Sequence, residues 1–114
     1  MNSGPLGPRL RSLREALGMS LRAFAGAIEL SPTYVSLVER GKAEPPTAER
    51  LEVIARVLRA DCDELCLLAG RLPPDLPALI LANPQLPGLI RKLAAFSTNH
   101  RASVLRIIER RGKS

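Results

Sequence analysis

The sequence predicts an all-α protein, because three of its features favour helices over strands. Apolar residues recur with a helical period of about 3.6 in short segments between residues 9 and 110. Ser, Thr or Asp precedes several of these segments, where a helix N-cap is expected. Aromatic residues form 3% of the chain and Trp is absent, so the core must be aliphatic. The 114 residues suffice for one compact domain and a small extension.

The N-terminal region is predicted to contain a disordered segment and a first helix. Residues 1–8 include two Gly and two Pro, and we expect them to be disordered. The helix is predicted over residues 9–17, where Leu10, Leu13 and Leu17 lie on one stripe before a glycine ends it.

Residues 19–42 describe two short helices crossed over a tight turn, which is the pattern of a helix-turn-helix. Ser20 is the candidate cap of the first helix. Ser31 is predicted to cap the second, over residues 31–40, and Pro32 suits its first position because no N–H is needed there. The predicted inward-facing residues are Phe24, Ala25, Ile28, Val35 and Val38. The outward face of the second helix is then a candidate surface for reading DNA.

Two more helices complete a domain predicted over residues 9–70. Thr47 is expected to cap a helix whose apolar residues follow the helical period. Asp61 and Glu64 are predicted to form a capping box at the start of the last helix. Residues 72–74, Leu-Pro-Pro, mark the predicted boundary of the domain.

Residues 75–111 are predicted to form a smaller helical unit, with helices over residues 75–82, 85–96 and 98–110. Two apolar stripes run along its second and third helices: Leu86, Leu89, Ile90 and Leu93, then Val104, Leu105, Ile107 and Ile108. Three helices this short cannot bury both stripes by themselves, so they need the DNA-binding domain, a second copy of the chain, or both. A dimer is the economical answer. We therefore predict that this is a dimerisation unit, which brings two recognition helices to half-sites about 34 Å apart.

Residues 31–42, SPTYVSLVERGK, resemble the recognition-helix signature of the Cro and phage-repressor (XRE) family of transcriptional regulators. The resemblance extends from about Arg9 to Gly70, where the order of five helices also matches. It implies a DNA-binding domain whose recognition helix lies in the major groove. It also implies that Arg14 and Glu39 form a structural ion pair between the first and third helices.

The resemblance implies contacts with base edges and phosphates along the recognition helix and around it. The candidate DNA-binding residues are Ser20, Leu21, Arg22, Ser31, Pro32, Thr33, Tyr34, Ser36, Leu37, Arg40 and Lys42. The chain departs from the family at two positions, since Leu21 stands where many relatives carry Gln and Glu29 where many carry Gly. The short hydroxyls of Thr33 and Ser36 are unselective, so DNA shape should supply part of the specificity.

The charge distribution agrees with binding to a polyanion. The net charge is +6, and fourteen of the seventeen basic residues are Arg, whose fork suits phosphate and guanine. The most basic part is residues 76–114, with seven bases and one acid. The terminal cluster of Arg110, Arg111 and Lys113 is interpreted either as a phosphate contact or as a solvated end. No apolar run is long enough to span a bilayer, so we expect a soluble, cytoplasmic protein.

The sequence offers no arrangement of catalytic groups, and we expect neither an enzyme nor a bound cofactor or metal. His100 is the single histidine and is expected at the surface or in a helix cap. Cys62 and Cys66 lie four residues apart on one helix face, but two thiols do not complete a zinc site. Small semi-buried thiols in a reducing cytosol are the favoured interpretation, with redox sensing as the alternative.

The function predicted from these features is a sequence-specific transcriptional regulator that binds a double-stranded operator as a homodimeric repressor. The sequence also allows a regulator that activates transcription instead of repressing it. A regulator controlled by a protein partner, such as an antitoxin or a repressor inactivated by proteolysis, is the alternative within DNA binding. A protein-binding adaptor with the same fold is the alternative from another class, and it should not shift DNA from its own upstream region.

Overall fold

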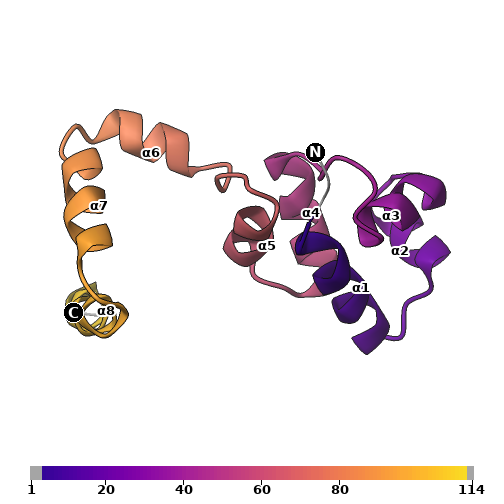
Figure 1. The fold of residues 1–114 in the computed structure, drawn as a ribbon, viewed down its shortest axis with the longest axis horizontal. Coiled ribbons are helices and arrows are strands. Elements are labelled where there is room, and N and C mark those ends of the chain that lie inside the picture. The colour runs from indigo at the N-terminus through magenta and orange to yellow at the C-terminus, as the bar shows by residue number, and fades with distance from the viewer. Residues whose placement is uncertain (1–3, 113–114) are drawn as a thin grey trace. The chain divides into compact units, whose positions relative to one another are not determined.

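The computed structural model describes residues 4–112, which form eight α-helices and no strand (Figure 1). The all-α prediction is therefore confirmed. The helices are α1 (Leu6–Ala16), α2 (Leu21–Ala27), α3 (Pro32–Glu39), α4 (Ala48–Leu58), α5 (Cys62–Leu68), α6 (Leu76–Ala82), α7 (Leu86–Ala95) and α8 (Thr98–Gly112). The chain divides between Leu76 and Pro77 into two compact units, called here the N-terminal and C-terminal units.

The N-terminal unit packs α1 to α5 around one aliphatic core with a single Phe at its centre. Helix α3 packs against both α1 and α2, and α4 packs against α5. The buried core side chains are Leu6, Leu10, Phe24, Ala25, Ile28, Val35, Val38, Leu51, Ile54, Ala55, Leu58, Leu65 and Cys66. This set includes every residue predicted to face inward from the helix-turn-helix. An apolar gap in this core holds about 10 Å³, too little for a ligand.

Helix α1 begins earlier than the sequence predicted. Its first residue is Leu6, which is completely buried, so the predicted disorder is wrong for the part of residues 1–8 that the helix includes; residues 1–3 lie outside the described part of the chain. Pro5 at the N-cap and Pro8 in the first turn are tolerated because first-turn N–H groups have no partner inside the helix. Leu17, predicted to lie on the apolar stripe, is instead 41% exposed beyond the helix end.

Gly7 allows α1 to approach α3 closely. A Cβ at this position would lie 2.5 Å from the Val38 carbonyl oxygen and 2.6 Å from that of Glu39. Gly7→Ala should therefore lower the free energy of unfolding by about 1 to 3 kcal/mol, because two backbone segments would have to move apart. Urea melts measure this. Gly26→Ala is the matched control, since a Cβ there meets nothing within 4 Å and should stabilise α2. Equal destabilisation by both would contradict this packing.

Side-chain caps begin α2, α3, α4 and α5, as the sequence predicted. The hydroxyls of Ser20, Ser31 and Thr47 accept from the third backbone N–H beyond each of them, and Asp61 accepts from the N–H of Asp63. The predicted capping box is wrong in its second half. Glu64 accepts from Arg9 of α1 at 3.2 Å, because a long-range guanidinium competes for the same carboxylate.

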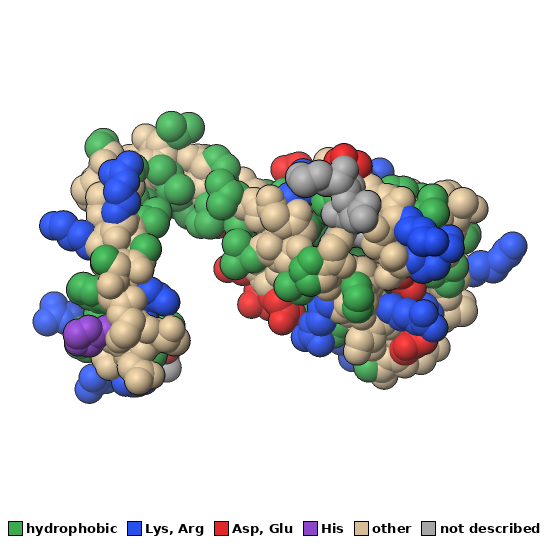
Figure 2. All heavy atoms as spheres, viewed as in Figure 1, with side chains coloured by type: hydrophobic (Ala, Val, Ile, Leu, Met, Phe, Trp, Pro, Cys, Tyr) green, Lys and Arg blue, Asp and Glu red, His purple; other side chains and the backbone are tan. Residues whose placement is uncertain are grey.

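The C-terminal unit contains α6, α7 and α8, with bounds within about two residues of those predicted. Every described residue of these three helices keeps part of its surface accessible, and Figure 2 shows hydrophobic side chains exposed over them. Leu89, Ile90, Leu105, Ile107 and Ile108 are each about half exposed. No helix among residues 4–112 combines the length and apolar character needed to cross a membrane.

Candidate nucleic-acid interface

The turn between α2 and α3 adopts the geometry that a helix-turn-helix requires. Glu29 has a φ of +57°, which lies in the left-handed region that favours glycine. The N–H of Leu30 donates to the Ala25 carbonyl at 3.0 Å, so the turn closes on the end of α2. A non-glycine residue therefore holds the turn at the position where the sequence departs from its family.

Both ends of α3 are capped by residues that directly flank the helix. Ser31 accepts from the N–H of Tyr34 at 3.0 Å, and Pro32 occupies the first helical position. At the other end, Gly41 has a φ of +71° and the N–H of Lys42 donates to the Leu37 carbonyl at 2.8 Å. These bonds fix a short helix whose N-terminus is open to an approaching anion or base edge.

The outward face of α3 forms an open hollow with the start of α2. Pro32 and Thr33 are exposed, and Ser36 and Leu37 are half-buried. The hollow is lined by Leu21, Pro32, Thr33, Ser36 and Arg40. The structure thus brings together five of the candidate DNA-binding residues on one accessible surface, which we call the reading surface.

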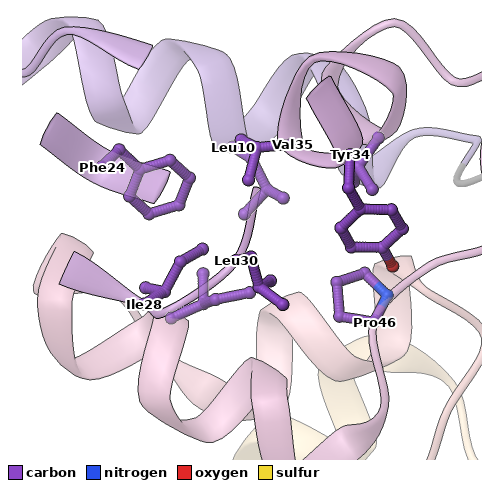
Figure 3. Close-up of a pocket in the computed structure, with 9 residues that line it drawn as sticks. Leu10, Phe24, Ile28, Leu30, Tyr34, Val35 and Pro46 are labelled. Carbon is purple, nitrogen blue, oxygen red and sulfur yellow. The ribbon is translucent and has the colours of Figure 1, made fainter. Parts of the chain in front are cut away.

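Tyr34 is directed away from the reading surface. Its ring lines the apolar core beside Pro46 (Figure 3), and its hydroxyl donates to the Glu44 carbonyl at 3.0 Å. Burial raises the pKa of Tyr34, so the hydroxyl stays a donor at neutral pH. Tyr34 is among the predicted DNA-binding residues, but its ring lies on the flank of α3, where the neighbouring apolar loop covers it.

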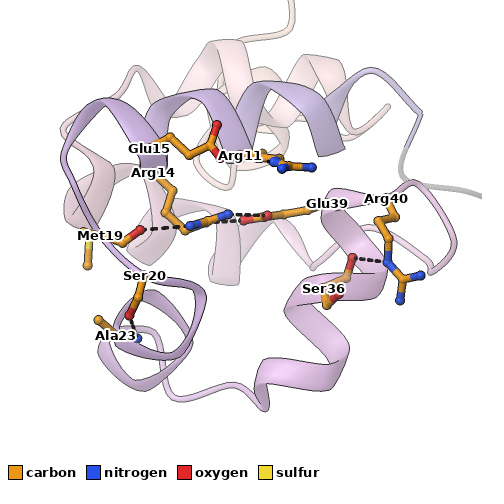
Figure 4. Close-up of polar contacts among 9 residues, drawn as sticks. All are labelled: Arg11, Arg14, Glu15, Met19, Ser20, Ala23, Ser36, Glu39 and Arg40. Carbon is orange, nitrogen blue, oxygen red and sulfur yellow. Dashed lines mark hydrogen bonds and ion pairs between the residues drawn. The ribbon is translucent and has the colours of Figure 1, made fainter.

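Arg14 of α1 and Glu39, the last residue of α3, face each other between the two helices (Figure 4). The guanidinium donates two bonds to the carboxylate, at 2.8 and 3.0 Å, and a third to the Met19 carbonyl at 2.9 Å. Their side chains are 11% and 5% exposed. The hydrogen bond to Glu39 raises the pKa of Arg14, so the guanidinium keeps its positive charge. The pair joins α1 to α3 and takes no part in the reading surface.

Arg40 lines the reading surface, and two further exposed cations lie within two residues of its lining in the sequence: Arg22 and Lys42. Arg40 also donates to the Ser36 carbonyl at 3.4 Å, which keeps it against α3. Arg50 is used differently, because its guanidinium donates to the Ile28 carbonyl at the end of α2, at 3.3 Å. The sequence does not predict that role, since a long-range bond from Arg to a carbonyl leaves no local pattern.

None of the residues considered for chemistry lines the reading surface. The sulfur atoms of Cys62 and Cys66 lie 3.8 Å apart on α5, and burial raises the pKa of the Cys66 thiol to about 12. Both cysteines are free thiols. His100 is exposed on α8, where its ring lies 5.3 Å from that of Phe96. No group of three or more metal-ligating side chains occurs among residues 4–112.

The candidate dimerisation residues fall on α7 and α8. Leu86, Leu93 and Val104 are half-buried, and the others are exposed. An apolar groove on these helices is lined by Leu93, Arg101, Val104, Leu105 and Ile108. The structure therefore brings residues of the two predicted stripes to one groove within the C-terminal unit.

Known proteins resemble this chain over the region that contains the helix-turn-helix. The family model of the helix-turn-helix domain matches residues 5–68. The HTH-type transcriptional regulator DdrOP3 of Deinococcus deserti is 36% identical over 99 residues, which cover 75% of each chain. The clp gene regulator ClgR of Corynebacterium glutamicum has a TM-score of 0.52 at 32% identity, over 77% of this chain and 88% of that one.

A second solved structure is that of SinR, the master regulator for biofilm formation, in complex with DNA. It has a TM-score of 0.50 at 28% identity and covers 53% of this chain and 95% of that one. The family match spans more than half of the chain and coincides with the helices that form the reading surface. The chain therefore belongs to the Cro and phage-repressor (XRE) family of helix-turn-helix transcriptional regulators.

Proposed function

We propose that this regulator is a homodimeric repressor that occupies a two-half-site operator in the cytoplasm. The observation that carries the proposal is the reading surface itself. Thr33, Ser36 and Arg40 line one hollow at a helix whose two ends are capped, and Arg22 and Lys42 are exposed within two residues of the lining in the sequence. A helix of this kind enters the major groove with its N-terminal turn toward base edges. SinR, which shares this fold, is solved in complex with DNA.

Dimerisation follows from the limits of a single reading surface. One eight-residue helix spans too few base pairs for selective binding, whereas two copies read two half-sites. The C-terminal unit offers exposed Leu and Ile side chains that a second copy would cover. Repression by occupancy needs no further chemistry, which agrees with a site built from hydroxyls, apolar groups and cations.

Substitutions on α3 should separate DNA reading from folding. Thr33→Ala and Ser36→Ala should change operator preference by roughly 1 to 3 kcal/mol per lost base contact, with little change in melting temperature. Glu39→Ala should instead lower stability by about 3 kcal/mol, because it leaves the Arg14 guanidinium buried without its carboxylate. Mobility shifts on DNA selected by the wild-type chain, beside thermal melts, measure both effects.

The same experiment distinguishes the proposed function from an adaptor. A regulator of this kind should shift DNA from its own upstream region or DNA selected from a random pool, whereas an adaptor should shift neither. The assignment of faces would be wrong if Ser36→Ala and Glu39→Ala lowered melting temperature and DNA binding in parallel. Arg56→Ala is a suitable control, since Arg56 is exposed on α4 and pairs weakly with Glu52 at 3.9 Å.

A further inference from the structure

The loop that follows the recognition helix is held by two side chains at three consecutive carbonyl groups. The Tyr34 hydroxyl donates to the carbonyl of Glu44 at 3.0 Å. The Arg71 guanidinium donates through Nη2 to the carbonyl of Pro45 at 2.7 Å and through Nε to that of Pro46. Prolines have no N–H, so this loop cannot be tied down through its own backbone donors at these positions.

Arg71 stands where the chain leaves the DNA-binding domain. Gly70, with a φ of +71°, turns the chain at the end of α5, and the N–H of Arg71 donates to the Cys66 carbonyl at 2.8 Å. Two residues later Pro73 is buried, and its carbonyl accepts from the N–H of Leu76 at 3.2 Å. The backbone is therefore fixed against the N-terminal unit as far as Pro73.

These bonds connect the exit of the domain to the recognition helix. Arg71 donates to the carbonyls of Pro45 and Pro46, and Tyr34 of α3 donates to the carbonyl one residue earlier. The planar fork of arginine can serve two adjacent carbonyls at once, which the single ammonium of lysine cannot do in the same geometry. The loop is thus bonded both to α3 and to the exit segment.

We propose that Arg71 is a positioning residue that fixes the direction in which the chain leaves the domain relative to α3, so that the dimer accepts operators of one half-site spacing. This inference rests on the proposed homodimer. Each inserted base pair moves a half-site by about 3.4 Å along the axis and rotates it by about 34°. An anchored exit opposes that displacement, whereas a released exit lets the recognition helix follow its half-site.

Binding to a series of operators tests the proposal. Two half-sites are taken from DNA selected by the wild-type chain and placed at centre-to-centre spacings from the preferred one to three base pairs longer. The wild-type affinity should fall about tenfold or more when two base pairs are inserted, whereas Arg71→Met should lose less than about threefold. Arg71→Met keeps an apolar stem and removes both donors. Its affinity for a single half-site should equal that of the wild type.

Three further variants show whether the effect belongs to this connection. Tyr34→Phe removes the hydrogen bond from the Tyr34 hydroxyl to the loop, and it should broaden the preference for half-site spacing as Arg71→Met does. Arg71→Lys should lie between the wild type and Arg71→Met. Arg9→Met is the matched control, because Arg9 contacts Glu64 of the same domain without touching the loop, and it should keep the wild-type preference. All variants are compared below their melting transitions.

Two results would overturn the inference while leaving the proposed function intact. One is a dimeric Arg71→Met chain that discriminates between spacings as sharply as the wild type. The other is an Arg9→Met chain that relaxes the preference as much as Arg71→Met does, since the effect would then be general destabilisation. A wild-type chain that sediments as a monomer when bound to its selected DNA would overturn both the homodimer and this inference.

Discussion

Raising the salt concentration from about 50 to about 200 mM should weaken operator binding by about 10³-fold. Each copy has three exposed cations in or next to the reading surface in the sequence, Arg22, Arg40 and Lys42, so a dimer would neutralise about six phosphates. Several other arginines are already engaged within the protein, including Arg14, Arg50 and Arg71. The expected effect therefore lies at the lower end of the range for DNA-binding proteins, and titrations at several salt concentrations measure it.

Single substitutions assign the slope of this salt dependence to individual cations. Arg22→Gln should reduce the slope of log affinity against log salt concentration by about one in each copy. Base preference should not change, because a phosphate contact does not depend on the DNA sequence. Arg56→Gln, on the exposed face of α4, should leave the slope unchanged. Binding that does not respond to salt in the wild-type chain would contradict recognition of DNA through this surface.

Truncation after Leu72 should leave a folded monomer with a strongly reduced affinity for the two-half-site operator. The buried core side chains all lie between Leu6 and Cys66, so the shortened domain keeps its own core. Without the C-terminal unit, the second recognition helix is no longer held close to the second half-site. The affinity for the two-half-site operator should therefore fall by about 10² to 10⁴-fold. Sedimentation of both chains, with mobility shifts on one operator, measures the two changes together.

Ile108→Glu in the full chain is the matched variant for this truncation. Ile108 is 57% exposed and lines the groove on α7 and α8, so a carboxylate should disturb association more than the helix itself. Both altered chains should bind a single half-site as the wild type does. A truncated chain that still sediments as a dimer would place the interface in α1 to α5.

Local signals allowed most of the N-terminal unit to be predicted from its sequence. Ser20, Ser31 and Thr47 cap the helices that they were expected to begin, because a cap needs a single side chain and its nearby N–H groups. The helical period likewise predicted the buried side of α2 and α3. The first turn of α1 was missed because Gly and Pro suggest disorder, whereas tertiary contact with α3 decides the outcome there.

The parts of the site that could not be predicted depend on contacts between distant segments. Tyr34 was expected at the reading surface, yet its ring is drawn to the loop around Pro46. The bonds from Arg50 and Arg71 to backbone carbonyls join residues more than twenty positions apart. Spacing along one helix carries no information on such pairs, so periodicity identified the outward face of α3 without identifying what holds that face in place.

The exposed apolar surface of α6, α7 and α8 has a consequence for how transcription would respond to the amount of regulator. In the proposed homodimer this surface would be covered by association, and the concentration of dimer would rise with the square of the monomer concentration while dimers are scarce. Doubling synthesis would then raise operator occupancy about fourfold in that range. Such a regulator converts small changes in gene dosage into a steep change in promoter output.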